Sequence, residues 1–311
     1  DCLLSRGLGD VYKRQILRNA LRKEKAILAE REKLPLHILY STPRWLVEKW
    51  TAQFGPEAAR KLLQWNNTTP RLYVRANSLI PLNDPPEGLV PLGGAPGWFS
   101  VEGLLPLKDV NSGALYVADP STRYAIDLLA PQPDEEILDA CAAPGGKSAA
   151  IIAATGGKAR LTATDLHEHR LPVLRENLAR YGSPSVATAQ ADWTQPCPPQ
   201  WEKRFDAVLL DVPCSNTGVI QRRVDVRWRL NPEEIRRLAA LQRTILENAS
   251  RAVRPGGRLV YSTCSIDAEE DGLLVREFLK DHPEWTLKEE KLVLPQEEKS
   301  DGAYAALLIC A

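Results

Sequence analysis

The sequence predicts an α/β protein whose main domain is a doubly wound, mostly parallel sheet with helices on both faces. From Glu136 onward, short apolar runs alternate with longer segments of helical spacing. Such alternation is typical of parallel sheets built from strand–helix–strand units. Polar and acidic residues follow directly after several of these runs. Since folds of this class bind ligands at the carboxyl ends of their strands, we expect a ligand site at that edge of the sheet.

The expected elements of the main domain follow one another in a regular order. The strands are expected in the runs ILDACA, RLTATDL, FDAVLLDV and GRLVYSTCS. The helices are expected in the segments GKSAAIIAATG, EHRLPVLRENLARYG and PEEIRRLAALQRTILENASRAVRPGG. These segments carry apolar residues three and four positions apart, which is the spacing of a helix with one buried face.

The part of the chain before the main domain has a different organisation. Residues 16–34 have the spacing of an amphipathic helix, two short helices are expected between Ser41 and Pro70, and RLYVRANSL alternates like a strand. Residues 80–98 are rich in proline and glycine and predict a linker. The expected divisions are 1–15, 16–40, 41–109 and 110–311. Residues 1–15 are set apart because Asp10–Gln15 back-translates to a transposon-end adapter of sequencing libraries.

Composition limits the class of protein and its environment. Forty Lys and Arg residues balance forty Asp and Glu residues, so any surface that binds nucleic acid must be local. No apolar run reaches the length of a membrane span, and no signal-peptide pattern is present. The six cysteines form no CxxC motif, so neither a disulfide framework nor a metal site is expected. We therefore expect a cytoplasmic protein.

The segment LDACAAPGGKSAAI places Pro144, Gly145 and Gly146 between an expected strand and an expected helix. It has three interpretations. The first is a plain strand-to-helix turn. The second is a phosphate loop of the GxxxxGK[ST] type, but Cys141 stands at the first position of that motif, where glycine is needed. The third interpretation is a nucleoside-cofactor loop, which is favoured by Asp165 and Asp192 after the next two runs, where carboxylates suit ribose hydroxyls and an adenine amino group.

Two cysteines stand at the polar ends of apolar runs. Cys214 follows Asp211 in LLDVPCSNTG, and Cys264 lies in YSTCS. A structural cysteine is buried and inert, whereas a reactive one is partly exposed and easily deprotonated. Either interpretation fits each cysteine alone, but two of them beside Asp211 favour a reactive pair. Cys197 and Cys310 are expected to be structural.

The motifs DACAAPGGKS, ATD, ADWTQ, LLDVPCSNTGVI and YSTCS, in this order, resemble those of the RNA cytosine-5 methyltransferase family, which includes Fmu/Sun and NSUN proteins. The resemblance extends from about Ser41 to the end and is strongest to the bacterial small-subunit ribosomal RNA enzymes. ILRNALRK resembles the last helix of a NusB-like RNA-binding domain, so residues 16–40 are expected to be its remnant and 41–109 a small RNA-binding subdomain. DNA cytosine-5 methyltransferases share a Pro-Cys motif, but the STCS turn favours the RNA family.

The resemblance implies a fold, a cofactor and a set of roles. The fold would be a Rossmann-like methyltransferase sheet that binds S-adenosylmethionine. Cys264 matches the thiol that attacks carbon 6 of cytosine, Cys214 the second thiol, and Asp211 the group that hydrogen-bonds the cytosine ring. The cofactor residues implied are Cys141, Ala142, Ala143, Pro144, Gly145, Gly146, Lys147, Asp165 for ribose, Asp192 for adenine, and Asp211 near the methyl donor.

The expected partner is RNA, most directly small-subunit ribosomal RNA, bound by a monomeric protein. A tRNA substrate and a non-catalytic RNA-binding or assembly factor are the alternatives. The segment VIQRRVDVRWRLNPEEIRR interleaves arginines with Trp228, and its Arg222, Arg223, Arg227 and Arg229 suit phosphates and bases. Its carboxylates equally suit a solvated surface of ion pairs. The chain also departs from the family pattern at Ala118, where glutamine is usual.

Overall fold

The computed structural model describes residues 2–31, 33–82, 85–183 and 186–311. The chain forms two compact units, Asp1–Asn67 and Thr68–Ala311. Among the described helices, none combines the length and the apolar character that a membrane crossing requires.

The first unit is helical. Its helices are α1 (Cys2–Arg22), α2 (Glu24–Arg31), α3 (Leu36–Leu39), α4 (Arg44–Phe54) and α5 (Pro56–Trp65). The two short helices expected after Ser41 are confirmed as α4 and α5. They are separated by Gly55, whose φ of 84° lies in the left-handed region, and Pro56 starts the second helix at a position that needs no backbone donor. Trp50 and Leu62 are fully buried within this unit.

The prediction of one amphipathic helix over residues 16–34 was wrong. The helix that contains Ile16 already begins at Cys2 and ends at Arg22, and α2 follows it separately. The apolar side chains of Ile16, Leu17 and Leu21 are 62%, 63% and 70% exposed. Helical spacing specifies a face that can be buried, but it does not supply the surface that buries it.

The second unit begins with a small antiparallel sheet in the order β2-β3-β1-β4. Its strands are β1 (Tyr73–Ala76), β2 (Leu89–Pro91), β3 (Trp98–Val101) and β4 (Leu115–Val117). The strand expected in RLYVRANSL is confirmed as β1, whereas the expected linker 80–98 contains β2 and the start of β3. Asn77 ties this sheet to the main domain, because its Nδ2 donates to the carbonyls of Gly113 and Tyr181, both at 3.0 Å.

The main sheet has seven strands in the order β10-β11-β9-β8-β5-β6-β7. They are β5 (Glu136–Asp139), β6 (Arg160–Asp165), β7 (Ala187–Gln190), β8 (Phe205–Asp211), β9 (Val253–Thr263), β10 (Trp285–Val293) and β11 (Ala303–Cys310). β5 to β9 are parallel, which confirms the doubly wound sheet, and β10 and β11 add an antiparallel edge. The chain order reverses between β5 and β8, and the crevice at such a reversal is where ligands bind.

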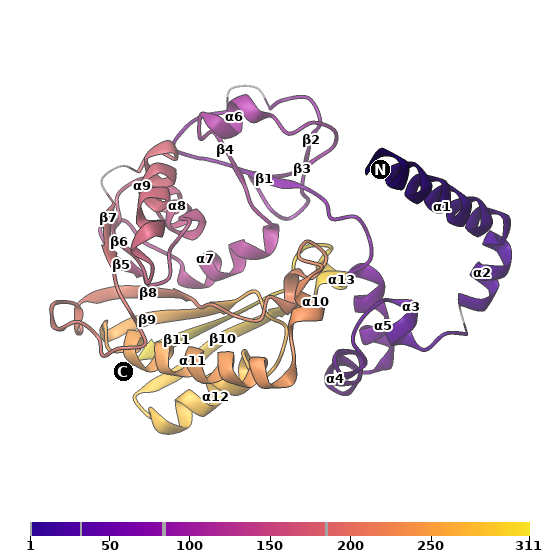
Figure 1. Ribbon diagram of the computed structural model, residues 1–311. Coiled ribbons are helices and arrows are strands. Elements are labelled where there is room, and N and C mark those ends of the chain that lie inside the picture. Colours follow the sequence, from indigo (N-terminus) through magenta and orange to yellow (C-terminus); the bar gives the residue numbers. More distant parts are fainter. Residues whose placement is uncertain (1, 32, 83–84, 184–185) are drawn as a thin grey trace. The chain divides into compact units, whose positions relative to one another are not determined.

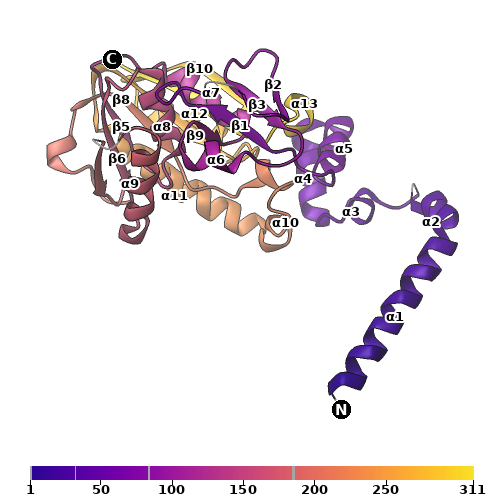
Figure 2. The ribbon, with the colours of Figure 1, turned by 90° about the horizontal axis from the view of Figure 1, so that it is seen from above.

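Helices cover both faces of this sheet. The α-helices described in this unit are α6 (Leu107–Asn111), α7 (Arg123–Leu129), α8 (Gly146–Ala154), α9 (Leu171–Arg180), α10 (Val226–Arg229), α11 (Pro232–Ser250), α12 (Gly272–Asp281) and α13 (Pro295–Glu298). In Figure 1, α7, α8 and α9 lie above the sheet and α11 and α12 below it. α8 and α9 lie side by side in both views (Figures 1 and 2).

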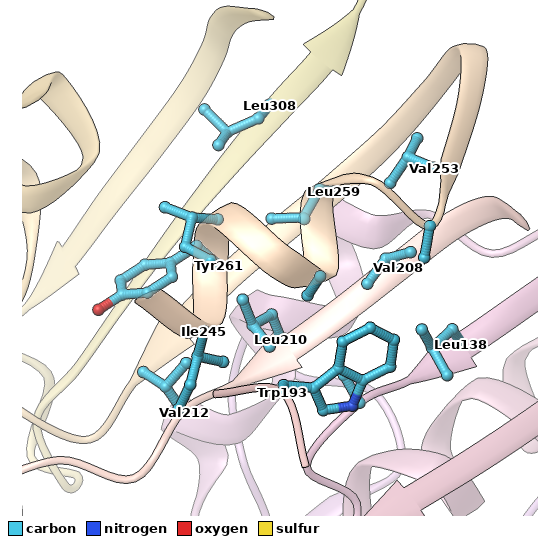
Figure 3. Close-up of a cluster of buried hydrophobic side chains, with 14 of the residues drawn as sticks. Leu138, Trp193, Val208, Leu210, Val212, Ile245, Val253, Leu259, Tyr261 and Leu308 are labelled. Atoms are coloured by element: carbon cyan, nitrogen blue, oxygen red, sulfur yellow. The ribbon is translucent and has the colours of Figure 1, made fainter. Parts of the chain in front are cut away.

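Successive side chains of the central strands point to opposite faces of the sheet and fill two hydrophobic cores. Leu209 of β8 belongs to the cluster under α7 and α8, while its neighbours Val208 and Leu210 belong to the cluster under α11. Figure 3 shows the second cluster, in which Ile245 of α11 lies among side chains from the sheet. Fully burying each such aliphatic side chain stabilises the fold by roughly 1.5–3 kcal/mol. The two cores fix the strand ends rigidly, and the candidate site lies on those ends.

Candidate active site

The loop Cys141–Lys147 leaves β5 and enters α8 directly. Gly145 has a φ of 107°, a backbone conformation that residues other than glycine rarely adopt. A Cβ on Gly146 would collide with the hydroxyl of Tyr116. The turn therefore requires both glycines. Because α8 begins at Gly146, the loop also presents the unpaired amides of a helix start to the carboxyl edge of the sheet.

Asp165 ends β6 and holds this loop in place. Its carboxylate accepts hydrogen bonds from the amides of Ala143 (3.2 Å) and His167 (3.0 Å). Arg170 forms an ion pair with the same carboxylate at 3.1 Å and donates to the Ala143 carbonyl at 2.9 Å. Sequence reasoning missed Arg170, which sits in the segment expected to be a helix and looked like an ordinary surface cation.

Asp192 follows β7 and is exposed. Its Oδ1 accepts from the amide of Thr194 at 2.9 Å and from the Thr194 hydroxyl at 2.6 Å. These contacts fix the carboxyl group in a local turn. The strand end thus presents an acidic group one strand further along the sheet than Asp165.

Asp211 ends β8 and pairs with Lys147 of the loop, with 2.7 Å between Oδ2 and Nζ. Burial disfavours the charge of the Lys147 ammonium, but the nearby charge of Asp211 and the hydrogen bond to it outweigh burial and raise the pKa of Lys147. Lys147 therefore carries its charge at neutral pH. The pair joins the loop Cys141–Lys147 to the strand that leads into Cys214.

The two thiols are brought together by neighbouring parallel strands. Asp211 of β8 pairs in register with Ser262 of β9, so the turns that follow both strands emerge side by side. The sulfur atoms of Cys214 and Cys264 lie 3.1 Å apart. The hydrogen bond to Cys264, together with burial, raises the pKa of the Cys214 thiol, so Cys214 keeps its proton at neutral pH.

Asn216, which sequence reasoning also missed, holds the turn beside the thiols. Its backbone is left-handed, with a φ of 63°, and its Nδ2 donates to the Cys214 carbonyl at 2.9 Å. Its Oδ1 lies 3.3 Å from the sulfur of Cys264. An Asn-Thr-Gly run after a strand is a common turn sequence, and that pattern alone gives no indication of a contact with a residue of another strand.

One cavity of about 480 Å³ collects the sequence-predicted residues. Its lining includes Cys141, Ala143, Pro144, Asp165, Asp192, Asp211, Cys214 and Cys264. A second cavity, of about 430 Å³, lies against the same loop and is lined by Ala142, Gly146, Lys147, Asp139 and residues of the small sheet. Gly145 lines neither cavity and instead packs close to Leu174 of α9.

These groups fit the methyl donor expected from the sequence. Carboxylates at the ends of β6 and β7 suit the hydroxyl and amino groups of a nucleoside. Next to the loop, the buried carboxyl of Asp139 has one oxygen, Oδ1, that finds no hydrogen-bond partner among the described residues, and Asp139 lines the second cavity. Burial raises the pKa of Asp139 to about 7. The described residues contain no group of three His, Cys, Asp or Glu side chains that suits a metal ion.

The arginine segment after Cys214 differs from the expected RNA surface. Arg222 forms ion pairs with Asp301 (2.9 Å) and Asp119 (3.0 Å), and Arg227 is 3% exposed. These two arginines are structural. The ion pairs of Arg222 and the burial of Arg227 make their charges inaccessible to a ligand. Arg229 pairs with Asp225 on the surface at 2.8 Å.

Arg223 and Trp228 remain available in the same segment. Arg223 lines the cavity that holds both thiols, and Trp228 is 63% exposed. A cation at the cavity and an exposed aromatic ring in the same segment suit phosphates and bases.

The other cysteines have structural surroundings. Cys197 and Cys310 pack against the core cluster under α11, and Cys141 does the same from the cofactor loop. Burial raises the pKa of all three thiols. Among the described residues, these cysteines are not joined by disulfides.

The doubly wound sheet has the strand order of Rossmann-like methyltransferases. At the carboxyl ends of its strands it carries a glycine-containing loop and aspartate side chains, and these features together define that class. The sequence model of the 16S rRNA methyltransferase RsmB/F family matches residues 126–309, and that of the RsmF/B-like ferredoxin-like domain matches residues 42–80. The chain belongs to the RsmB/F family.

Relatives and solved structures agree with this assignment. The chain is 34% identical over 314 residues to ribosomal RNA small subunit methyltransferase B of Salmonella arizonae, and 36% identical over 289 residues to that of Vibrio cholerae. These matches cover 94% and 86% of this chain, but only 72% and 65% of the relatives. The crystal structure of the protein PH0851 superposes with a TM-score of 0.82 at 29% identity, covering 88% of this chain and 67% of that one. NSun6 from Pyrococcus horikoshii, solved with SFG, shares the fold, with a TM-score of 0.72 at 22% identity over 86% of this chain and 98% of that one.

Proposed function

We propose that the chain transfers a methyl group from S-adenosylmethionine to carbon 5 of a cytosine in small-subunit ribosomal RNA. The observation that carries this proposal is the pair of thiols, Cys214 and Cys264, 3.1 Å apart beside Asp211 in one cavity with the cofactor loop. Carbon 5 of cytosine is a weak nucleophile, so a methyltransferase that acts on it needs a thiol to activate the ring. Membership of the RsmB/F family supports the RNA substrate.

Different residues of the chain carry out the separate steps of the reaction. The Cys264 sulfur, as thiolate, forms a bond to carbon 6, and the electron pair of the 5,6 double bond becomes available at carbon 5. Asp211 accepts a hydrogen bond from the protonated ring nitrogen and stabilises the charge that develops there. S-adenosylmethionine supplies the methyl group to carbon 5.

Product release then needs a base and a leaving group. Loss of the carbon 5 proton restores the double bond, and the Cys264 sulfur leaves from carbon 6 with its electron pair. Solvent takes up the carbon 5 proton. We assign to Cys214 the donation of its own proton to the departing Cys264 sulfur, because the two sulfurs lie 3.1 Å apart. The raised pKa of Cys214 keeps it protonated while Cys264 attacks, so the two thiols do not compete for carbon 6.

The cofactor would be held by the loop Cys141–Lys147, with Asp165 toward ribose and Asp192 toward adenine. Asp165 is fixed by Arg170 and by the loop amide of Ala143, so its orientation exists before any ligand binds. A cytosine in a paired stem would have to turn out of the helix to reach Cys264. We assign residues 41–109 to binding the surrounding RNA, together with Arg223, which lines the cavity, and the exposed Trp228.

The proposal is tested by transfer of labelled methyl from S-adenosylmethionine to unmodified small-subunit ribosomal RNA, followed by mass spectrometry of the nucleosides. We expect labelled 5-methylcytosine, with total tRNA as the comparison substrate. Label in another nucleoside would overturn the position of transfer, and 5-methylcytosine formed only in tRNA would overturn the substrate.

A further inference from the structure

Glu270 is a fully buried carboxyl group that belongs to neither the cofactor loop nor the thiol pair. It is 0% exposed and lies in the turn between β9 and α12, six positions after Cys264. Burying such a group without partners would cost several kcal/mol, so its contacts must be complete for the fold to tolerate it.

Each oxygen of Glu270 has two partners. Oε1 accepts from the amide of Ser215 at 2.9 Å and from Nε2 of Gln242 at 2.7 Å. Oε2 accepts from the Ser265 hydroxyl at 2.7 Å and makes a short hydrogen bond with the Ser215 hydroxyl. Ser215 follows Cys214 and Ser265 follows Cys264, so one carboxyl group holds the residues next to both thiols.

Gln242 and Tyr261 extend this connection to the rigid elements of the domain. Gln242 of α11 donates to the Pro213 carbonyl at 2.9 Å with the same nitrogen that it offers to Glu270. The Tyr261 hydroxyl of β9 donates to the backbone carbonyl of Glu270 at 2.6 Å. The positions of both thiol turns are thus tied to a helix and to a strand of the core.

We propose that Glu270 is a positioning residue that sets the separation of the Cys214 and Cys264 sulfurs. This inference rests on the proposed function for its consequence in catalysis. The position of the two sulfurs can, however, be measured without RNA. Displacing a reacting group by about 1 Å costs up to about 100-fold in rate, so a loosened Cys264 turn would slow methyl transfer.

Two substitutions of Glu270 separate its hydrogen bonds from its charge. Glu270→Gln keeps the shape, because the amide oxygen still accepts from Ser215 and Gln242 while the amide nitrogen faces two hydroxyls that can rotate to accept. Glu270→Ala leaves Ser215, Gln242 and Ser265 without their shared acceptor. We therefore expect a small effect from glutamine and a large one from alanine.

The direct measurement is the rate at which diamide joins Cys214 to Cys264. The two sulfurs each lose a proton and together lose two electrons, which diamide takes up as it becomes a hydrazine, and an S–S bond forms. Sulfurs 3.1 Å apart need to approach by only about 1 Å to reach the disulfide bond length. Mass spectrometry of peptides containing Cys214 and Cys264 follows the reaction.

We expect Glu270→Ala to slow this oxidation about 10-fold or more and Glu270→Gln to slow it less than about 3-fold. Glu135→Gln is the control, because Glu135 also bridges segments through hydrogen bonds, to Arg258 and Gln132, away from the thiol turns. An unchanged rate in Glu270→Ala would overturn the inference. If Glu270→Ala does not fold, as shown by the lack of a cooperative unfolding transition, Ser265→Ala is the second variant. It removes the hydrogen bond from the Cys264 turn to Glu270, together with the contacts of the same hydroxyl to Ser215, Thr217 and the Asp267 amide, and should slow oxidation in the same direction. No slowing in Ser265→Ala would also overturn the inference.

Kinetics with RNA distinguish this inference from the proposed function. We expect Glu270→Ala to lower kcat for methyl transfer about 10- to 100-fold, with the KM for RNA within about 2-fold of the unsubstituted protein. A raised KM with unchanged kcat would contradict a positioning role. Absence of transfer by the unsubstituted chain, with the order of oxidation rates as expected, would count against the proposed function alone.

Discussion

The sulfur of Cys264 lies 3.1 Å from that of Cys214, although fifty positions separate the two residues in the sequence. The distance follows from the fold, because β8 and β9 are parallel neighbours and both turns leave the same edge of the sheet. The hydrogen bond to the neighbouring sulfur, together with burial, raises the pKa of Cys214. The predictions below depend on this arrangement and on the loop beside it.

Gly146→Ala should weaken the binding of S-adenosylmethionine about 10-fold or more. A Cβ at this position meets the Tyr116 hydroxyl, so the loop or the Tyr116 ring beside it has to move, and overpacking of this kind costs about 1–3 kcal/mol. Titration calorimetry of the two proteins measures the affinity. Gly93→Ala is the control, since a Cβ there meets no atom within 4 Å. Equal affinities of the Gly146 variant and the unsubstituted chain would show that the loop does not touch the cofactor.

Asp139→Asn should change how stability depends on pH. Burial raises the folded-state pKa of Asp139 from 3.8 to about 7, so between these values the folded protein binds a proton that the unfolded chain releases. The stability that this proton contributes is complete below about pH 4 and is lost as the pH rises to 7.

Asparagine at position 139 does not titrate, so Asp139→Asn should gain stability relative to the unsubstituted chain as the pH rises from 4 to 8. At about 1.4 kcal/mol per pKa unit, the relative gain is at most about 4 kcal/mol. Urea denaturation at several pH values measures it. Glu102→Gln, which changes an exposed carboxyl, is the control. A stability difference that stays constant from pH 4 to pH 8 would be inconsistent with a raised pKa.

Two neighbouring arginines should behave differently on substitution. Arg223→Ala should weaken RNA binding and reduce the dependence of log affinity on log salt by about one, because Arg223 lines the cavity and would contact a phosphate. Filter binding across a salt series measures this slope. If Arg223→Ala leaves the slope unchanged, Arg223 does not contact the phosphate backbone.

Arg222→Ala should instead lower the free energy of unfolding, by about 1–3 kcal/mol, because it leaves Asp119 and Asp301 beside each other without their cation. The estimate is reduced for the partial exposure of Arg222. Thermal or urea denaturation checks it. A loss of RNA affinity without loss of stability would place Arg222 in the RNA surface after all.

The sequence predicted the main sheet and the residues of its carboxyl edge because these depend on local patterns. Strand runs, helical spacing and a Gly-Gly turn are readable position by position, and parallel pairing then places Asp165, Asp211 and Cys264 at one edge. The antiparallel strand β10 was not predicted, because its four consecutive charged residues, 288–291, look like a solvated segment until β11 pairs with it.

Residues whose role depends on a distant partner could not be predicted. Glu270 lies in the acidic run DAEEDG, which reads as a surface turn, and only the packing of Ser215 and Gln242 around it makes it a buried acceptor. Arg222 looked available for RNA because its partner Asp301 is 79 positions away. Charge pairing between distant segments leaves no local pattern in a single sequence.

The central claim is that Cys264 bonds to the RNA and Cys214 allows its release. Its most direct measurement is denaturing electrophoresis of labelled small-subunit RNA after incubation with S-adenosylmethionine and each cysteine variant. We expect Cys214→Ala to accumulate a covalent protein–RNA adduct, and Cys264→Ala and the double variant to form none. An adduct that persists in Cys264→Ala, or full methyl transfer by that variant, would contradict the account.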